Sequence, residues 1–528
     1  MYQVQKEIAT TKTRDGVMLV ADVYRPHTEE RLPILLMRQP YGRAIASTVV
    51  YAHPKWYASQ GYIVVIQDVR GRGDSGGEFR LFESEIEDGE DTLHWLSNFE
   101  GSTGEIGMYG FSYQGMTQIY GALSEHPALK TICPAMIASD LYADWAYENG
   151  AFCYELNLAW AIQLAAETAR LKKDFAAYNV LYLASRNLPV WDIPSMVEEV
   201  LRKYAPFYYR WLNTPPEDDY WRRLSPQSYL DQIDLPMLHI GGWFDGYLRG
   251  TWKFYQQMRA KSQFQQSLIV GPWCHIPWGN RKGDRTYSSS ANNNINEIQI
   301  DWFNHYLKGE KKSDLISENA RLFLMGENKW IEQEEIKKKK ATKLYLQSTG
   351  LGNIKDDDGQ LVTQNNHFSE DIIVTDFWRP VPSFGGHNSV MAGSFERGEL
   401  DQRSDIITYT SDFLQESLTI IGDISLQLKV SCDHSTFDIS AVLSQVYPDG
   451  KVYNFSQGYI TVTDHQPRDV ILFDLQPCAI ALAANTALRL SLSGSAFPAY
   501  SLHRGATNEA QTITLSVLCG DQSFLHIS

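Results

Sequence analysis

This chain of 528 residues lacks several features that mark large classes of proteins. No apolar run approaches the ~20 residues that a membrane-spanning helix needs. The N-terminal residues Met-Tyr-Gln-Val-Gln-Lys-Glu contain no apolar core of a secretory signal. The six cysteines are scattered and include no Cys-x-x-Cys pair, which favours reduced thiols over a disulfide framework. We therefore expect a cytoplasmic protein without a membrane partner.

Basic charge is also scarce. The chain has 47 Lys and Arg residues against 63 Asp and Glu residues, a formal net charge of −16. Such a surface disfavours nucleic acid, because neutralising phosphates requires positive charge. The sequence has no His-Glu-x-x-His, no phosphate-binding Gly-Lys-Ser/Thr and no calcium loop, so we expect no metal and no cofactor. A small-molecule substrate fits best, and the sequence leaves homo-oligomerisation open.

The chain is too long for a single hydrophobic core. Its first part and a later part contain short apolar runs of the kind that form buried parallel strands. Those runs are Val17–Tyr24, Pro33–Met37, Tyr62–Asp68, Ile106–Tyr109, Pro236–Ile240 and Ser267–Val270. Between them, long helical patterns are dense in aromatic residues. We expect an α/β domain formed by residues 1–139 and 231–336, with a helical cap inserted at 140–230.

The C-terminal part has a different pattern. Glu332–Lys343 is dense in charge and is expected to be a solvated connector. Beyond it, Leu418–Val430 alternates apolar and polar residues, Phe437–Val446 is strand-like, and Asp449-Gly450 is a hairpin turn signal. Residues 337–528 are therefore predicted to form an all-β domain, either a β-sandwich or a jelly roll.

A candidate nucleophile lies at a predicted strand-to-helix turn. Gly110-Phe-Ser-Tyr-Gln-Gly115 follows the strand Ile106–Tyr109 and precedes a helical run. A sharp turn of this kind exposes the serine of α/β-hydrolases, and it requires small residues nearby. Most such enzymes carry Gly-x-Ser-x-Gly, whereas here the second glycine comes one residue later. On its own the motif is a weak indication of a nucleophile.

An acid and a histidine follow in the order that this fold requires. A serine hydroxyl needs a histidine to take its proton, and that histidine needs a carboxylate to hold its tautomer. Asp245 ends the loop after the strand Leu235–Ile240, and His275 ends the loop after the strand Ser267–Val270. Singly, Asp245 is equally compatible with a loop cap and His275 with a structural histidine. Together with Ser112 they predict a catalytic triad.

Acyl transfer also requires donors for the developing oxyanion. One is expected to be the backbone N–H of Tyr113, the residue after the nucleophile. The second normally comes from the loop after an early strand, here Arg38-Gln-Pro-Tyr-Gly42. The Tyr41 phenol is the candidate in that loop, although a packing role is the simpler interpretation from these residues alone.

The segment Arg70-Gly-Arg-Gly-Asp-Ser-Gly-Gly77 imitates three other motifs. It contains the nucleophile stretch of chymotrypsin-like proteases, but no suitably placed histidine and aspartate precede it. It spells a dinucleotide fingerprint, but no convincing apolar-faced helix follows. It contains Arg-Gly-Asp, which has no role without secretion. We expect a loop that braces the rim of the active site.

Taken together, these motifs resemble the cocaine-esterase-like group of the X-prolyl dipeptidyl-peptidase superfamily. That superfamily includes α-amino-acid ester hydrolases and glutaryl-cephalosporin acylases. The resemblance rests on Gly110-x-Ser-Tyr-x-Gly115, Gly242-Trp-Phe-Asp245 and Gly271-Pro-Trp-x-His275, with support from Pro40–Gly42, Asp68–Gly77, Glu87–Thr92, Phe395–Arg403 and Tyr409–Ser411. It spans nearly the whole chain and makes the displaced glycine a family trait.

The resemblance implies an α/β-hydrolase domain with a helical cap and a jelly-roll-like C-terminal domain. It implies Ser112 as nucleophile, Asp245 and His275 as its partners, and Tyr41 with the Tyr113 N–H as the oxyanion hole. The expected activity is hydrolysis of carboxylic esters or amides through an acyl-enzyme. Alternatives are release of X-Pro dipeptides, β-lactam side-chain acylase activity and, more remotely, a non-catalytic binding protein.

The residues leave the acyl donor open. Relatives that bind a substrate amine use carboxylates near the pocket, whereas Gln114 at the elbow carries no charge. Asp140, Asp144 and Glu148 are spaced for one helical face and are equally compatible with a solvated stripe. The side chains expected to line the pocket are Gln114, Asp140, Asp144, Trp145, Trp243, Phe244 and Trp273.

Overall fold

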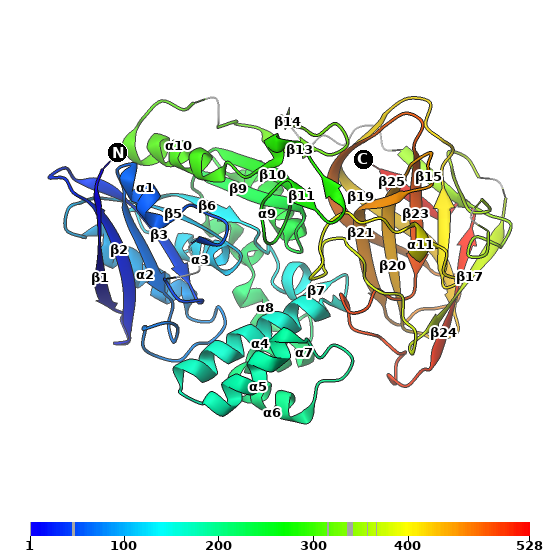
Figure 1. Ribbon diagram of the computed structural model, residues 1–528, viewed down its shortest axis with the longest axis horizontal. Helices are drawn as coiled ribbons and strands as arrows, with labels where there is room; N and C mark the ends of the chain where they lie inside the picture. Colours follow the sequence, from blue (N-terminus) through cyan, green and yellow to red (C-terminus); the bar gives the residue numbers. More distant parts are fainter. Residues whose placement is uncertain are drawn as a thin grey trace.

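The computed structural model describes residues 2–44, 48–313, 316–334, 342–355, 357–365 and 367–527. Three regions can be followed in Figure 1: a mixed α/β region in blue and green, a helical insertion in teal, and an all-β region in yellow to red. Most of the predicted connector, Glu332–Lys343, lies outside the described residues. No helix of the described ranges has both the length and the apolarity to span a membrane.

The α/β region is built on one sheet, with the order β1-β2-β4-β3-β5-β6-β9-β10-β13-β14. Neighbouring strands from β4 to β13 run parallel, and β1, β2 and β14 are antiparallel additions at the edges. The strands are β1 (Val4–Lys12), β2 (Met18–Pro26), β3 (Leu32–Gln39), β4 (Ile63–Asp68), β5 (Ser102–Phe111), β6 (Leu129–Ala135), β9 (Met237–Phe244), β10 (Gln266–Cys274), β13 (Ala320–Leu324) and β14 (Lys329–Gln333).

Helices cover both faces of this sheet, which is why its central strands are mostly buried and rich in apolar residues. Side chains alternate along β3: Leu35 and Met37 share a core with α1 (Pro54–Ser59) and α10 (Ile295–Lys308). Ile34 and Leu36 belong to the core of the opposite face. The helices of that face are α2 (Glu85–Ser97), α3 (Tyr113–Ala122) and α9 (Leu248–Lys261).

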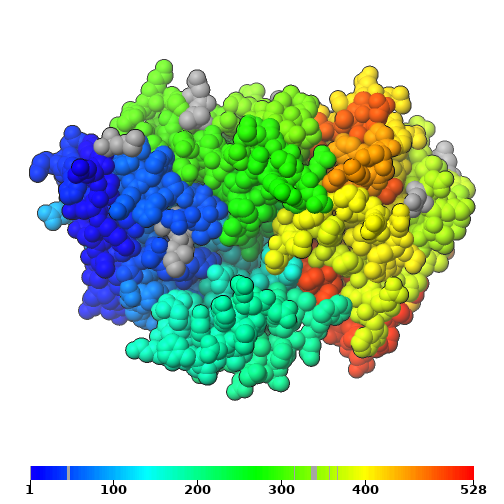
Figure 2. Space-filling view, in the orientation of Figure 1, coloured from blue at the N-terminus to red at the C-terminus, as the bar shows by residue number. Residues whose placement is uncertain are grey.

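The helical insertion lies between β6 and β9 in the chain. It begins with a π-helix, η2 (Tyr142–Ala146), and a short hairpin of β7 (Tyr147–Glu148) and β8 (Ala151–Phe152). Its helices are α4 (Tyr154–Leu171), α5 (Phe175–Arg186), α6 (Ser195–Tyr204), α7 (Pro206–Asn213), α8 (Asp219–Leu224) and η3 (Pro226–Gln232). In Figure 2 the insertion adjoins both other regions, and hydrogen bonds described below join it to both.

The C-terminal region is all-β apart from the short helix α11 (Gly398–Asp401). Its sheet runs β17-β24-β19-β25-β15-β16-β18-β23-β20-β21, with β22 paired to β19. The strands are β15 (Thr342–Gln347), β16 (Gln360–Val362), β17 (Ser369–Asp376), β18 (Ile406–Thr410), β19 (Leu418–Cys432), β20 (Phe437–Val446), β21 (Val452–Val462), β22 (Val470–Leu482), β23 (Ala487–Ser493), β24 (Thr512–Cys519) and β25 (Phe524–Ile527). In the α/β region, short pieces follow β10 and precede α10: β11 (Arg281–Lys282), β12 (Arg285–Thr286) and η4 (Ser289–Ala291).

The expected fold class is confirmed: a mixed α/β region with an inserted set of helices, followed by an all-β region. The edge strand β1 was not predicted from the sequence, because its residues are mostly polar and form no apolar run. In the structure most of its side chains are exposed. The domain bounds 1–139 with 231–336, 140–230 and 337–528 remain predictions.

Candidate active site

Ser112 lies on the turn between β5 and α3 with φ +62° and ψ −128°. This left-handed backbone conformation is strained for a residue with a side chain, and such strain is typical of functional sites. A Cβ on Gly115 would lie 2.5 Å from Ile137 Cγ2 and 2.7 Å from the carbonyl oxygen of Ala135. Glycine at 115 therefore lets α3 pack directly against the end of β6.

The departure from Gly-x-Ser-x-Gly has a steric counterpart at Gly110. Gly110 has φ +146°, and a Cβ there would lie 2.5 Å from the Cβ of Gln114. Gln114 occupies the position of the usual second glycine, and its Oε1 accepts a hydrogen bond from the Phe111 N–H at 3.3 Å. The elbow thus tolerates a side chain at 114 because residue 110 has none.

His275 and Asp245 follow the adjacent parallel strands β10 and β9. The Nδ1 atom of His275 lies 2.8 Å from Oδ1 of Asp245, and the Asp245 side chain is fully buried. The His275 side chain remains 31% exposed, and its ring centroid lies 5.4 Å from that of Phe111 and 5.0 Å from that of Tyr247. A carboxylate on Nδ1 leaves Nε2 as the ring nitrogen available for proton transfer.

Two candidate oxyanion donors lie beside Ser112. Tyr113 begins α3, so its N–H is among those without an acceptor inside the helix. The Tyr113 phenol points away and donates to Glu85 Oε1 at 2.7 Å. The Tyr41 phenol oxygen accepts a hydrogen bond from Trp160 Nε1 at 3.1 Å. Burial raises the pKa of Tyr41 to about 12, although its interactions with Trp160 and Ser112 lower it.

A cavity of about 380 Å³ unites these groups. Ser112, His275 and Tyr41 all line it, together with one face of α4. The other lining residues are apolar or uncharged: Val49, Phe111, Gln114, Leu156, Ala159, Trp160, Gln163, Gly246, Tyr247 and Ile276. This volume and composition suit a small organic ligand with a predominantly apolar body.

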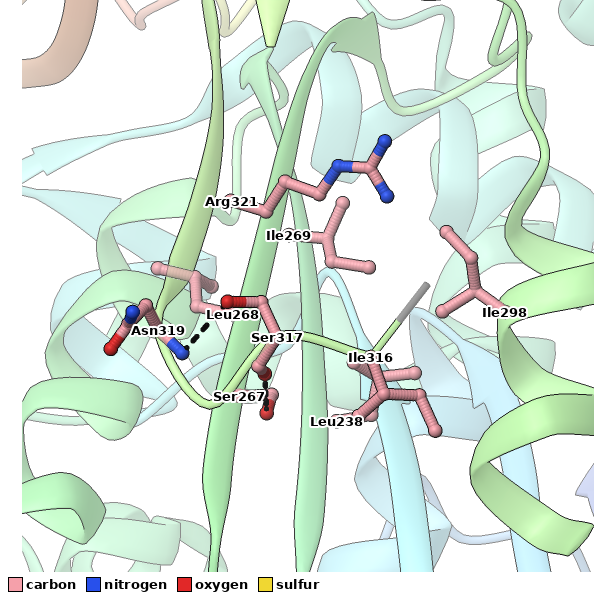
Figure 3. A pocket seen from close by; sticks show the side chains of 9 residues that line it. All are labelled: Leu238, Ser267, Leu268, Ile269, Ile298, Ile316, Ser317, Asn319 and Arg321. Atoms are coloured by element: carbon pink, nitrogen blue, oxygen red, sulfur yellow. Dashed lines mark hydrogen bonds between the residues drawn. The ribbon is translucent and has the colours of Figure 1, made fainter. Parts of the chain in front are cut away.

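A second cavity is too small to hold a substrate. It lies among β9, β10, β13 and α10, and Figure 3 shows its lining of apolar side chains with Ser267, Ser317, Asn319 and Arg321. Its volume is about 10 Å³, and Ser267 Oγ is already bonded to the Ser317 carbonyl at 2.6 Å. A space of that size holds about one water molecule, so it is a packing void.

Asp68 at the end of β4 and Asp74 in the glycine-rich loop that follows both hold Arg43, in the loop that carries Tyr41. Buried Asp68 accepts hydrogen bonds from the Arg43 N–H at 2.7 Å and from Gln39 Nε2 at 3.1 Å, and it forms an ion pair with Arg43 at 2.6 Å. Gln39 Oε1 in turn accepts the Tyr41 N–H at 2.7 Å. Gly73 is required here, since a Cβ would lie 2.0 Å from Asp68 Oδ2. These contacts fix the backbone of the Tyr41 loop.

Four aromatic side chains expected in the pocket lie outside the cavity lining. Trp243 donates to the Phe323 carbonyl at 2.8 Å, and Trp273 donates to the Ala291 carbonyl at 2.8 Å. Phe244 belongs to a buried core cluster. Trp145 lies behind the lining, stacked on Tyr247 with ring centroids 4.1 Å apart. Main-chain hydrogen bonds and core packing therefore hold the rings of β9 and β10 away from the cavity.

The three carboxylates at the start of the insertion also lie outside the lining. Asp144 is buried, accepts the N–H of Asp140 at 2.8 Å, and has its pKa raised by burial. Asp140 accepts the N–H of Tyr142 at 2.9 Å and contacts Gln227. Glu148 is fully buried in ion pairs. The expected single helical face is wrong, because η2 is a π-helix and Glu148 is in β7.

Sequence reasoning missed the cap residues that do line the cavity. Leu156, Ala159, Trp160 and Gln163 are spaced i, i+3, i+4 and i+7 on α4. That spacing marks one helix face, but it does not reveal whether the face meets a core or a cavity. Gln476 was missed as well: its Nε2 donates to the Asp245 carbonyl at 2.7 Å from β22. No local signal in the sequence connects these two residues.

Comparison with known proteins shows the family of this chain. Residues 15–277 match the X-Pro dipeptidyl-peptidase (S15 family), and residues 317–516 match the X-Pro dipeptidyl-peptidase C-terminal non-catalytic domain. The chain belongs to the X-Pro dipeptidyl-peptidase and cocaine esterase superfamily. As a member of this superfamily it is an enzyme, a serine hydrolase.

Individual superfamily relatives cover most of the chain. It is 28% identical to the cocaine esterase of Rhodococcus sp. (strain MB1 Bresler), over 97% of this chain and 94% of the relative. A putative serine esterase of Mycobacterium bovis is 23% identical over 85% of this chain and 79% of its own length. Among solved structures, an aminopeptidase from a marine sediment Thaumarchaeota archaeon (TM-score 0.83) and an α-amino acid ester hydrolase (TM-score 0.77) are each 21% identical, and each comparison covers 100% of this chain and 96% of the other. The superfamily fold is thus present from end to end.

Proposed function

We propose that this serine hydrolase cleaves neutral carboxylic esters, and activated amides of similar shape, through an acyl-enzyme on Ser112. The observation that carries the proposal is the 2.8 Å contact of His275 Nδ1 with buried Asp245, at a cavity that Ser112 and Tyr41 also line. A nucleophile, a base, an orienting carboxylate and an oxyanion donor therefore converge on one space.

The reaction follows from these positions. Ser112 Oγ attacks the acyl carbon while His275 Nε2 takes the hydroxyl proton. The carbonyl oxygen becomes an oxyanion that the Tyr41 hydroxyl and the Tyr113 N–H stabilise. When the tetrahedral intermediate collapses, His275 gives its proton to the leaving alcohol or amine. Water then attacks the acyl-enzyme by the same route and releases the acid and free Ser112.

The cavity wall favours an uncharged acyl group. Within the described ranges, the lining contains no carboxylate and no cation other than the form that His275 adopts when protonated. A peptide with a free N-terminal ammonium would lose hydration there without gaining a partner, which is costly. Asp140, Asp144 and Glu148 make their contacts with protein groups outside the lining. Ester hydrolysis is therefore preferred over release of X-Pro dipeptides.

Ser112→Ala tests the nucleophile directly. Turnover of a p-nitrophenyl ester should fall by at least about 10³-fold, with the circular dichroism spectrum and melting temperature retained. Ser124→Ala, at the far end of α3 where the hydroxyl bonds to the Gly121 carbonyl, is the matched control and should keep full activity. Retained activity in Ser112→Ala would disprove the triad.

A substrate panel tests the class of acyl donor. We expect neutral aryl esters to be cleaved with a higher kcat/KM than an X-Pro anilide or a β-lactam amide. A fluorophosphonate probe should label the wild type and not Ser112→Ala. A preference for the X-Pro anilide would favour the peptidase alternative, and absence of labelling would favour a binding protein.

A further inference from the structure

Trp160 makes the contact that decides where the proton of Tyr41 can point. Its indole Nε1 lies 3.1 Å from the Tyr41 hydroxyl oxygen, joining α4 of the insertion to the loop after β3. We infer that Trp160 is a positioning residue, which orients the Tyr41 O–H toward the oxyanion formed on Ser112. This inference rests on the proposed function, in which Tyr41 is an oxyanion donor.

The direction of the hydrogen bond carries the inference. An indole N–H is a donor only, whereas a phenol has one proton to donate and lone pairs that accept. Trp160 therefore occupies a lone pair of the Tyr41 oxygen and cannot receive its proton. That proton is left for the cavity side, where Tyr41 and Ser112 line the same space. The phenol is thus a fixed donor before substrate arrives, which is the preorganisation that oxyanion stabilisation requires.

Trp160 is itself held on several sides. Its ring lies 5.4 Å from that of Trp145 and 5.9 Å from that of Phe207, measured between centroids. One turn further along α4, the carbonyl of Leu164 accepts hydrogen bonds from buried Arg72 at 3.2 and 3.3 Å. The indole N–H therefore has little freedom to turn away from Tyr41.

The same hydrogen bond affects how strongly Tyr41 donates. Burial raises the pKa of the phenol to about 12, so it stays protonated at neutral pH. Donation from Trp160 to the phenol oxygen acts in the opposite direction, because it stabilises negative charge on that oxygen. It therefore makes Tyr41 the stronger donor as charge develops on the substrate. A ring that only packed against substrate would have no such effect.

Trp160→Phe removes the N–H and keeps an aromatic ring. We expect kcat for an aryl ester to fall about 10-fold, with KM changed by less than about threefold, since the hydrogen bond matters most in the transition state. Tyr41→Phe should lower kcat about 100-fold or more. If Trp160 acts through Tyr41, Trp160→Phe should change kcat less than about twofold in the Tyr41→Phe background.

Trp145→Phe is the matched control. Trp145 neighbours Trp160, but its Nε1 has no hydrogen-bond partner among the described residues. Any effect of Trp145→Phe on kcat should combine additively with that of Tyr41→Phe. Additive behaviour of Trp160→Phe as well would overturn the inference, because Trp160 would then act by packing alone.

A second substitution guards against a folding defect. Replacing Trp160 with 3-benzothienylalanine retains the shape of the indole and exchanges only the N–H for sulfur. It should reproduce the loss in kcat and weaken a phenylboronic acid adduct about 10-fold, with inhibition by the matching carboxylate product unchanged. Wild-type kcat in this variant would overturn the inference.

The kinetic results that would refute the proposed function differ from those that would refute the role of Trp160. Active Ser112→Ala would refute the triad, and wild-type kcat in Tyr41→Phe would refute the oxyanion assignment on which the inference depends. A loss of about 100-fold in Tyr41→Phe with an additive Trp160→Phe would leave the proposed function standing and overturn only the role of Trp160.

Discussion

The serine and the aspartate of the site are held by different means. Ser112 sits on a turn whose geometry comes from its own neighbours: β5 before it, α3 after it, and glycines at 110 and 115. The loop after Asp245 is held from outside the α/β region. Gln476 of β22 donates to the Asp245 carbonyl, and a Cβ on Gly246 would lie 3.5 Å from Asn388 Oδ1 and the His387 carbonyl.

The external support of the Asp245 loop continues into a buried charged cluster. Glu148 of β7 pairs with Arg249 at 2.8 Å and with His387 at 2.8 Å, and it accepts the Tyr500 hydroxyl at 2.5 Å. Arg249 is in the first turn of α9, directly after the Asp245 loop. The cluster therefore joins the α/β region, the insertion and the all-β region at one point.

The elbow and the Asp245 loop should therefore respond to different substitutions. The elbow depends on local sterics, so small changes within a few residues should damage it. The aspartate loop depends on distant partners, so changes in the all-β region should reach it without touching the cavity. The following substitutions test that separation, beginning with the largest expected effect.

Glu148→Gln should cause the largest loss of stability. It removes the carboxylate from a fully buried pair and leaves Arg249 and His387 facing a neutral amide, for which a loss of about 3–5 kcal/mol in the free energy of unfolding is expected. Urea denaturation at pH 7 measures it. Arg202 pairs with Glu198 on the exposed face of α6, so Glu198→Gln is the control and should change stability by less than about 1 kcal/mol.

The same cluster predicts a pH dependence. Burial alone would raise the pKa of Glu148, but Arg249 and His387 outweigh it and lower that pKa from 4.5 to about 2. Between pH 4.5 and about 2, the folded state therefore binds fewer protons than the unfolded state. Stability from Glu148 is present above pH 4.5 and is lost as pH falls toward 2. Denaturation curves of Glu148→Gln should lack this part of the acid slope, and an unchanged slope would contradict the assignment.

Gly115→Ala tests the elbow. The added methyl group would lie 2.5 Å from Ile137 and 2.7 Å from the Ala135 carbonyl, so α3 must shift, at a cost of about 1–3 kcal/mol. Thermal unfolding should show the loss, and ester turnover should fall with it. Gly121→Ala is the control on the same helix, since its nearest neighbour is the flexible end of Met108 at 3.3 Å. Equal melting temperatures for the two variants would refute the steric argument.

Gln476→Leu should have the smallest effect. It removes the 2.7 Å hydrogen bond to the Asp245 carbonyl while keeping similar volume, so we expect kcat to fall about fivefold. Gln445→Leu is the control, because Gln445 bonds to Thr486 and Tyr447 within the all-β region. Loss of kcat in both variants would indicate general loosening instead of a specific effect on Asp245.

The sequence predicted those features whose causes are local. Strand runs, the elbow glycines, and the order of Ser112, Asp245 and His275 all depend on short segments and on chain order in the sheet. It did not predict the contact of Trp160 with Tyr41, 119 residues away, or that of Gln476 with Asp245, 231 residues away. Many aromatic residues in 140–230 fit the same periodicity, and only packing decides which of them reaches the cavity.

The rings of β9 and β10 that were expected in the pocket lie outside the cavity lining for a related reason. Trp243, Phe244 and Trp273 are close in sequence to Asp245 and His275, and proximity along the chain suggested proximity in space. The indoles of Trp243 and Trp273 instead donate to the main-chain carbonyls of Phe323 and Ala291, and Phe244 packs in a buried core. Asp140 precedes η2 and Asp144 lies within it, and a π-helix does not follow the spacing of an α-helix, so the spacing did not predict where these carboxylates lie.

The N-terminus of α4 is anchored on the all-β region. The N–H groups of Tyr154 and Glu155 donate to the carbonyls of Ala499 and Pro498 at 2.9 and 3.1 Å, so the helix that walls the cavity ends on that region. Loop 497–500 therefore anchors this helix although none of its residues lines the cavity. Directed evolution for bulkier acyl groups should find useful changes there, in a segment that a search confined to the cavity lining would leave unvaried.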